Sequence, residues 1–463
     1  AGRLMSVWGV EACATEDTYA WAKVDGAAAF QRVTLTAHDS GDRRWRQELR
    51  RKMWRALDEI KPQVVVLPGW SFADALSALL WCAKTNTPSV VMTESTDWDE
   101  QRISFKEWVK SRLVRLNSAG LAGGTPHRDY LRQLGLPGER VFFGYDVVDN
   151  EHFARRAKEA RRWRMEGGGM DNGQWTTDNG QRTTDYGPQT TDHGPAGSNS
   201  SLPSSICNLP SSISDLPPSK FFLASARFVE KKNLPRLIQA YARYRTLCGT
   251  QRSQTADHGQ QTTDNRLRTT DHGLRTADRE ASQVGGPVVS GPVVPWNMVL
   301  LGDGPLRASI FQLRSSLGLE NCLHLPGFKQ YEELPVYFGL AGAFVHASTT
   351  EQWGLVVNEA MASGLPVLVS HRCGCAEDLV SPGVNGFQFD PANVDEMARL
   401  MFKVSQDDFP LSEFGAASSR IISQWGPERF ATGLRDAVAT ALKHPRPRAG
   451  VLDQILLRLM LQR

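Results

Sequence analysis

The chain has 463 residues, enough for two or three domains, and its hydrophobic content of 41% is slightly low for a fully globular protein. Its 53 basic and 50 acidic residues leave a net charge of +3, which gives no electrostatic argument for nucleic-acid binding. Seven scattered cysteines favour a reducing compartment, and no second pair at ligand spacing completes a zinc site with Cys373 and Cys375. We therefore expect a cytoplasmic protein without a resident metal.

The N-terminal part of the chain alternates helical patterns with short apolar runs. The segments "RWRQELRRKMWRALDEI" and "FADALSALLWCAKT" have helical patterns, and each is followed by a strand-like run, "QVVVLPGW" and "PSVVMTES". This alternation is typical of parallel strands covered by helices. Residues 1–163 are therefore predicted to form one α/β domain.

Two tracts do not have the composition of a folded segment. Each repeats "TTD"-like units so that aspartates recur every seven residues, as at Asp171 and Asp178 or at Asp257 and Asp264. A coiled coil needs apolar residues at two positions of each heptad, and here the repeated positions hold Asp, Gly and Thr. The flanking Ser-, Pro- and Gly-rich sequence cannot offset its ordering entropy by burial. We therefore predict disordered insertions over residues 164–218 and 250–293.

A second strand and helix series runs from "KFFLASARF" to "GFQFDP" and predicts another parallel α/β domain over residues 219–424, interrupted by the second insertion. Residues 425–463 look helical and end in "VLDQILLRLMLQR". The predicted fold class is thus α/β, with two Rossmann-like domains facing across a cleft. Such domains bind ligands at the carboxyl ends of their strands.

Glu351 and Glu359 lie eight residues apart in "STTEQWGLVVNEAMASGLPVLVS". Residues from Gly354 to Ser363 favour a helix that ends at Gly364, a residue suited to a left-handed cap. No helical neighbour can neutralise Glu359, so its charge needs a partner from another segment or a ligand. A buried salt bridge is one interpretation. The other is that both glutamates bind a polyhydroxylated ligand whose phosphate meets the helix N-terminus.

The same two carboxylates could in principle be the acid and nucleophile of a glycosidase. Those groups lie about 5 to 9.5 Å apart, whereas eight residues of continuous helix rise about 12 Å. Because Glu351 precedes the helix, this comparison disfavours a hydrolase without excluding it.

Elsewhere, Arg227 and Lys232 follow a strand and open a helix, where two cations suit a diphosphate. "LLGDGPLR" and "LPGF" add glycine turns at strand ends.

Together, "ARFVEKKNL", "LLGDGPL", "LPGF", "EQWGLVVNE", "AMASGLPV" and "GVNGFQFDP" resemble the retaining nucleotide-sugar glycosyltransferases of family 4, which have the GT-B fold. The resemblance covers the second domain and extends weakly to "GYDVVDNEHF". It implies a nucleotide-sugar donor, no cofactor and no metal. It assigns catalytic roles to Glu351 with the transferred sugar and to Arg227 and Lys232 with the donor diphosphate. The implied donor-binding residues are Gly302, Gly327, Phe328, Gly354, Leu355 and Glu359.

This chain also departs from the family pattern. Asn233 stands where the family usually has Gly, and Glu94 and Ser95 replace a common His, so these two are candidates for the acceptor side. No counterpart of the family's N-terminal glycine-rich loop precedes "RLMSVWGVE", and from this we expect a truncated form with weakened activity. An Asp-x-Asp pair, Asp97 and Asp99, is attributed to chance.

The resemblance therefore predicts transfer of a sugar, with retention of configuration, to a glycan, lipid or small-molecule acceptor in polysaccharide or glycoconjugate synthesis. The alternatives are a non-catalytic nucleotide-sugar-binding or scaffold protein with a decayed site, an epimerase and a phosphorylase.

Residues 451–463 pair Leu and Ile with Arg, which suits peripheral contact with the inner face of the cell membrane. They suit equally a last helix that packs on the first domain.

Overall fold

The computed structural model describes residues 6–13, 31–36, 42–166, 169–171, 174–176, 216–217, 220–261, 294–444 and 449–461. Most of both predicted insertions lies outside these residues. Within the first, strands β7 (Gly169–Asp171) and β8 (Gln174–Thr176) pair antiparallel. Helix α6 (Leu234–Gln261) runs past residue 250 into the second.

The N-terminal half contains a four-stranded parallel sheet in the order β3-β4-β5-β6. Its strands are β3 (Val65–Pro68), β4 (Ser89–Thr93), β5 (Ala119–Ala122) and β6 (Val141–Phe143). A separate parallel pair joins β1 (Trp8–Cys13) to β2 (Gln31–Thr36). The helices of this half are α1 (Arg43–Ile60), α2 (Ala73–Thr85), α3 (Ser104–Val114), α4 (Thr125–Gln133) and the short turn η1 (Gly138–Arg140). The expected helix and strand alternation is confirmed.

The C-terminal half contains a six-stranded parallel sheet in the order β11-β10-β9-β12-β13-β14. Its strands are β9 (Phe221–Ser225), β10 (Asn297–Leu301), β11 (Leu323–Gly327), β12 (Ala343–His346), β13 (Val367–Ser370) and β14 (Gly386–Phe389). The accompanying helices are α6, α7 (Arg307–Ser316), α8 (Leu334–Leu340), α9 (Leu355–Ala362), α10 (Ala376–Leu379), α11 (Val394–Val404) and α12 (Leu411–Ile422). The α/β fold class with two parallel sheets is thereby confirmed.

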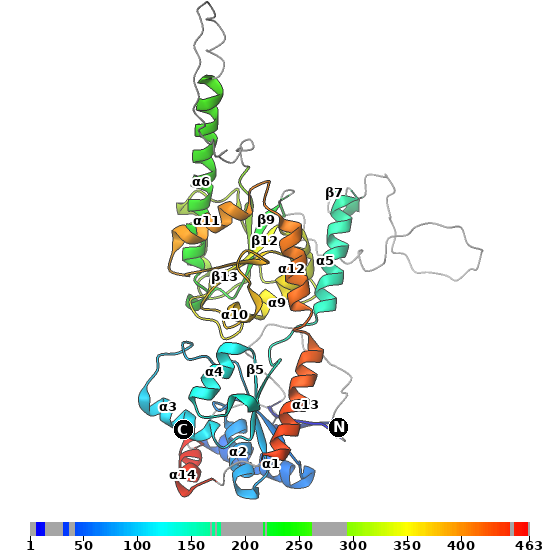
Figure 1. The fold of residues 1–463 in the computed structure, drawn as a ribbon, viewed down its shortest axis with the longest axis vertical. Coiled ribbons are helices and arrows are strands. Elements are labelled where there is room, and N and C mark those ends of the chain that lie inside the picture. The colour runs from blue at the N-terminus through cyan, green and yellow to red at the C-terminus, as the bar shows by residue number, and fades with distance from the viewer. Residues whose placement is uncertain are drawn as a thin grey trace, which may run out of the picture.

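Two helical segments cross between the halves (Figure 1). Helix α5 (Asn150–Met165) follows the first sheet in the chain but packs on α8 and α9 of the second half. Helix α13 (Pro427–Lys443) follows the second half but packs on β5 and β6 of the first sheet. Helix α14 (Val451–Met460) then contacts α2 and α3. None of the described helices is both long and apolar enough to span a bilayer.

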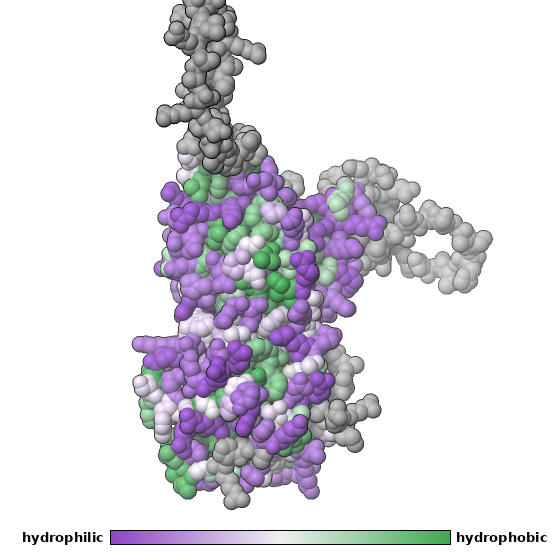
Figure 2. All heavy atoms as spheres, in the orientation of Figure 1, coloured by the Kyte–Doolittle hydropathy of each residue, from purple (hydrophilic) through white to green (hydrophobic). Residues whose placement is uncertain are grey.

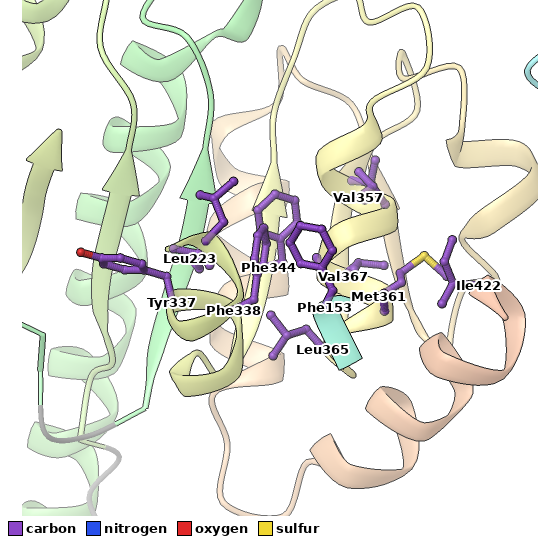
Figure 3. Packing of buried hydrophobic residues seen from close by; sticks show 14 of the residues in the cluster. Phe153, Leu223, Tyr337, Phe338, Phe344, Val357, Met361, Leu365, Val367 and Ile422 are labelled. Carbon is purple, nitrogen blue, oxygen red and sulfur yellow. The ribbon is translucent and has the colours of Figure 1, made fainter. Parts of the chain in front are cut away.

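The core of the C-terminal half explains why α9 sits where it does. Phe153 of α5, Phe338 of α8 and Phe344 of β12 are fully buried, and Val357 and Met361 of α9 pack into the same cluster (Figure 3). Burying such side chains contributes roughly 1.5 to 3 kcal/mol each. One face of α9 is therefore held rigidly against the sheet, which positions the segment that carries Glu351 and Glu359.

Candidate active site between the two halves

The carboxyl ends of the two sheets meet through direct contacts. Thr125, which opens α4, donates its N–H and its hydroxyl to the carboxylate of Asp378 in α10, at 2.8 and 2.7 Å. His127 Nδ1 accepts from the N–H of Gly124 at 3.0 Å, so its proton is on Nε2, which donates to the Gln352 carbonyl at 2.8 Å. These bonds fix the loop that contains Glu351 against the first half.

Glu351 is bound by three side chains of the C-terminal half. Its carboxylate pairs with the ammonium group of Lys232, and its Oε2 lies 3.4 Å from His346 Nε2 and 3.2 Å from the Ser348 hydroxyl. Burial by itself raises the pKa of Glu351, but the hydrogen bond from His346 and the charge of Lys232 hold that pKa well below its usual range. Glu351 is therefore a permanent anion near neutral pH.

Glu359 has the opposite surroundings. It lies in the second turn of α9, partly buried, and within the described part of the chain no ion pair is formed by its carboxylate. Burial raises the pKa of Glu359 to about 8. Burial of Tyr331 and, to a smaller extent, the charge of Glu359 raise the pKa of Tyr331 to about 12. The alternative interpretation of Glu359 as half of a buried salt bridge is not supported by these contacts.

The N-terminus of α9 lies between the two glutamates. Gly354 occupies the N-cap position with φ of 106°, a left-handed conformation that strains any residue with a Cβ, and it supplies no side-chain cap. The N–H groups that precede Val357 therefore lack intrahelical partners, whereas the Val357 N–H donates to the Gly354 carbonyl at 2.8 Å. Leu355, the first helical residue, is 41% exposed. At the other end Gly364 has φ of 76°, the predicted left-handed cap.

The cationic loop after β9 lies next to Glu351. Arg227 is exposed, and Lys232 ends the short turn η3 (Glu230–Lys232) and contacts Glu351. Asn233 follows with φ of 57°, and its amide donates to the carbonyls of Ala347 and Pro391 at 3.0 and 2.7 Å. Asn is among the few residues that tolerate this conformation. The departure from the family's Gly is thus accommodated, and the Asn ties the loop to the sheet.

The glycine turns after β10 and β11 have different environments. A Cβ at Gly302 would lie 1.9 Å from the Ala226 carbonyl oxygen, so the protein backbone itself requires glycine there. A Cβ at Gly327, where φ is 83°, would meet nothing within 4 Å. Phe328, the next residue, is 39% exposed. An exposed aromatic ring beside an open turn is the kind of surface on which a nucleobase can stack.

The first half contributes an acidic edge. Glu94 and Ser95 directly follow β4, and Glu94 feels the charges of Glu351 and Lys231 across the interface. Sequence reasoning missed His346, Ser348 and Asp146, although each follows or ends an apolar strand. That position could have identified them as candidates, because strand ends of a parallel sheet converge on one edge. His346 and Ser348 contact nearby Glu351, whereas the partners of Asp146 come from segments far away in the chain.

The Asp-x-Asp pair has a local structural role at Asp99. Its carboxylate pairs with Arg102 and accepts the N–H of Thr96 at 3.1 Å. Among the described residues, no group of three or more His, Cys, Asp or Glu side chains could hold a metal ion.

Comparison with known proteins places the second half in a family. Residues 280–419 match the family described as glycosyl transferases group 1. The chain is similar to an alpha-monoglucosyldiacylglycerol synthase of Acholeplasma laidlawii, with 29% identity over 109 residues, 24% of this chain and 27% of that protein. It is also similar to the amylovoran biosynthesis glycosyltransferase AmsK of Erwinia amylovora, with 31% identity over 115 residues, 24% of this chain and 28% of that protein. The chain thus matches just over a quarter of the length of these relatives.

Likeness to solved structures extends over most of the chain. HepE of Anabaena, in complex with UDP and glucose, aligns with a TM-score of 0.55 and 17% identity over 89% of this chain and 86% of that one. A sucrose-phosphate synthase of Thermosynechococcus elongatus aligns with a TM-score of 0.55 and 14% identity over 89% and 81%. At such identities the likeness concerns the fold. From these comparisons we conclude that residues 280–419 match the group 1 glycosyltransferase family and that the chain shares the two-domain GT-B fold of its structural neighbours.

Proposed function

We propose that this protein transfers a sugar from a nucleoside diphosphate to an acceptor hydroxyl with retention of configuration. The observation that carries the proposal is the pair of glutamates on either side of the α9 N-terminus: Glu351 is held as an anion, and no described residue forms an ion pair with Glu359. Such an arrangement suits a ligand with hydroxyls at both ends and phosphate between them. A nucleotide sugar has that order of groups.

In this proposal, Glu351 accepts hydrogen bonds from the transferred sugar and Glu359 accepts them from the ribose hydroxyls. The free N–H groups at Gly354 and Leu355 and the partial positive charge of the helix face the diphosphate. Arg227 and Lys232 stabilise the charge that develops on the diphosphate as the bond to the sugar breaks. Lys232 would then act on both groups, because it already orients Glu351.

The donor is proposed to be a UDP-sugar. HepE, whose fold this chain shares, was solved with UDP and glucose and also with UDP-glucose. The open turn at Gly327 and the exposed ring of Phe328 are proposed to receive the base, and the backbone at Gly302 to border the same site. Because the cations and the helix N-terminus can neutralise the diphosphate, no metal is needed.

The acceptor is proposed to be a glycan, a lipid or a small polyol bound on the side of Glu94 and Ser95. Two relatives are named for a diacylglycerol glycolipid and for amylovoran, which supports a role in glycoconjugate or polysaccharide synthesis. The donor domain is thereby assigned to the second half and the acceptor side to the first.

We also propose that helix α14 makes peripheral contact with the inner face of the cell membrane. One face of α14 is anchored, with Leu457 buried and Asp453 paired with Arg112 at 2.7 Å. The opposite face exposes Val451, Leu452, Ile455 and Leu459, between 44 and 77%. Figure 2 has an apolar patch at the lower left, where Figure 1 draws α14. An exposed apolar face of this kind suits the boundary between headgroups and acyl chains.

The test is to incubate the full chain with UDP-glucose, UDP-galactose, UDP-N-acetylglucosamine and GDP-mannose, in the presence of glucose or dioctanoylglycerol, and to measure release of nucleoside diphosphate. Glu351→Ala and Arg227→Ala are expected to lose transfer, and NMR of the product is expected to give the anomeric configuration of the donor. Exposed Lys52→Ala serves as the control. Full activity in both site variants would refute the site assignment, and an inverted anomer would refute retention.

A further inference from the structure

Glu94 and Asp146 lie at the same edge of the first sheet. Glu94 follows β4 and Asp146 follows β6, and β5 lies between these two strands. The strand ends are tied together, because Gly123 N–H donates to the Thr93 carbonyl at 3.3 Å and Gly144 N–H to the Ala122 carbonyl at 3.1 Å. A side chain at the end of β5 would occupy the space beside the Asp146 carboxyl.

Gly123 leaves that space open. A Cβ at this position would lie 2.4 Å from Asp146 Oδ2, 3.1 Å from the Trp353 ring and 3.3 Å from the His127 ring. The Asp146 carboxyl therefore packs directly against the Gly123 backbone. Any larger residue would push it away from Glu94 or displace the interface with the second half.

Asp146 is held from the other half of the molecule as well. It is only 7% exposed, and its carbonyl accepts from the amide of Asn358 at 3.4 Å. Asn358 lies in α9 between the two glutamates of the donor site and accepts from Trp353 Nε1–H at 3.0 Å. The carboxyl pair is thus built into the contact that joins the acceptor side to the donor side.

The pair needs a proton. Asp146 Oδ2 is buried without a hydrogen-bond partner among the described residues. Burial and the neighbouring Glu94 carboxyl raise the pKa of Asp146 well above its usual range, and two carboxyl groups can hydrogen-bond to each other only when one carries a proton. The charges that face Glu94 are mostly negative, from Asp99 and Glu351, with Lys231 opposing them, and the neighbouring Tyr145 adds no positive charge. These surroundings favour retention of the shared proton.

We propose that Glu94 and Asp146 share one proton and form a subsite that binds a neutral hydroxyl of the acceptor. Half-buried Glu94 touches the acceptor, and Asp146 is the positioning residue behind it. A protonated pair offers both a donor and acceptors, which is what a sugar or glycerol hydroxyl requires, whereas a fully ionised pair would only accept. This inference rests on the proposed glycosyl transfer and specifies its acceptor side.

The shared proton is tested without any substrate. The folded protein keeps a proton that the unfolded chain releases above pH ~4. The free energy of unfolding is therefore expected to fall as pH rises from about 5 toward 8. In the isosteric variants Glu94→Gln and Asp146→Asn this loss is expected to shrink, whereas exposed Glu100→Gln should retain the wild-type pH dependence. Urea unfolding at pH 5, 6, 7 and 8 gives the slopes. Equal slopes in all four proteins would overturn the shared proton.

The acceptor role is tested by steady-state kinetics with glucose or dioctanoylglycerol, depending on which of them accepts the sugar in the transfer assay. Loss of one hydrogen bond is expected to raise the KM for the acceptor about tenfold in Glu94→Gln, and UDP affinity measured by calorimetry should be unchanged. In the wild type, the same KM should rise as increasing pH removes the shared proton, and in Asp146→Asn this rise should be lost. Normal transfer with wild-type acceptor KM in both variants would overturn the inference and leave the proposed function intact. Absence of transfer from every donor, with UDP binding lost, would overturn the proposed function itself.

Discussion

The glutamate that precedes helix α9 and the glutamate within it have contrasting surroundings. In the loop before the helix, Glu351 is neutralised by Lys232 and hydrogen-bonded by His346 and Ser348, so it stays ionised. In the second turn of α9, Glu359 is partly buried, none of the described residues forms an ion pair with it, and burial raises its pKa to about 8. The difference shows that one motif can contain a prepared anion and an unsatisfied one. We infer that the second is completed by the ligand.

The largest expected effect comes from removing the cation that Glu351 depends on. Lys232→Met leaves a largely buried carboxylate unpaired, which should cost about 3 to 5 kcal/mol of unfolding free energy. Exposed Lys52→Met, which breaks the Lys52–Glu48 pair, should change stability by less than about 1 kcal/mol. Urea unfolding measures both. Adding Glu351→Gln to Lys232→Met should recover part of the loss, and equal stability of the single and double variants would contradict this account of Glu351.

Glu359→Gln is expected to raise stability, whereas Lys232→Met lowers it. The folded-state pKa of Glu359 lies above its unfolded value, so the folded protein holds an extra proton and wild-type stability falls as pH rises from about 4.5 through 8. At pH 8.5 the variant should be more stable than wild type by about 1 to 3 kcal/mol, and at pH 4 the two should be similar. UDP binding, measured by calorimetry, should weaken. A variant that is less stable at pH 8.5 would imply a cationic partner for Glu359.

Gly354→Ala, at the N-terminus of α9 between the two glutamates, is expected to have a smaller effect on stability. Its φ of 106° should cost an alanine about 1 to 2 kcal/mol, although a Cβ would meet the nearest atoms only at 3.5 Å. Donor affinity should fall as well, since the N–H groups there would shift. Gly383→Ala, with φ of 79° and no neighbour within 4 Å, is the control for strain alone. Equal loss of UDP binding in both variants would argue against a phosphate at α9.

The smallest expected effect belongs to Ser348→Ala. It removes one hydrogen bond to Glu351, 3.2 Å long, while Lys232 and His346 remain. Stability should fall by about 0.5 to 1.5 kcal/mol, and the rate of nucleoside diphosphate release should decrease only a few-fold. A loss of activity as large as that of Glu351→Ala would mean that Ser348 touches the substrate itself.

Much of the local structure around the site was predictable because it depends on neighbouring residues. The α9 helix, its left-handed cap at Gly364 and the strand series on either side follow from periodicity and turn chemistry. The Lys232–Glu351 pair was not predicted, since 119 residues separate its partners. Asp146 was missed for a similar reason, as its environment comes from β4, β5 and α9.

By itself, the sequence determined the parallel α/β layers, the order of the motifs and the family resemblance, because these depend on patterns within short windows of chain. Only the tertiary structure decided which carboxylate has a cation, which glycine is required by its neighbours and where the two acidic strand ends meet. Those properties depend on burial and on distances between segments far apart in the chain. A pKa follows the local dielectric and nearby charges, and neither is encoded at the position of the residue itself.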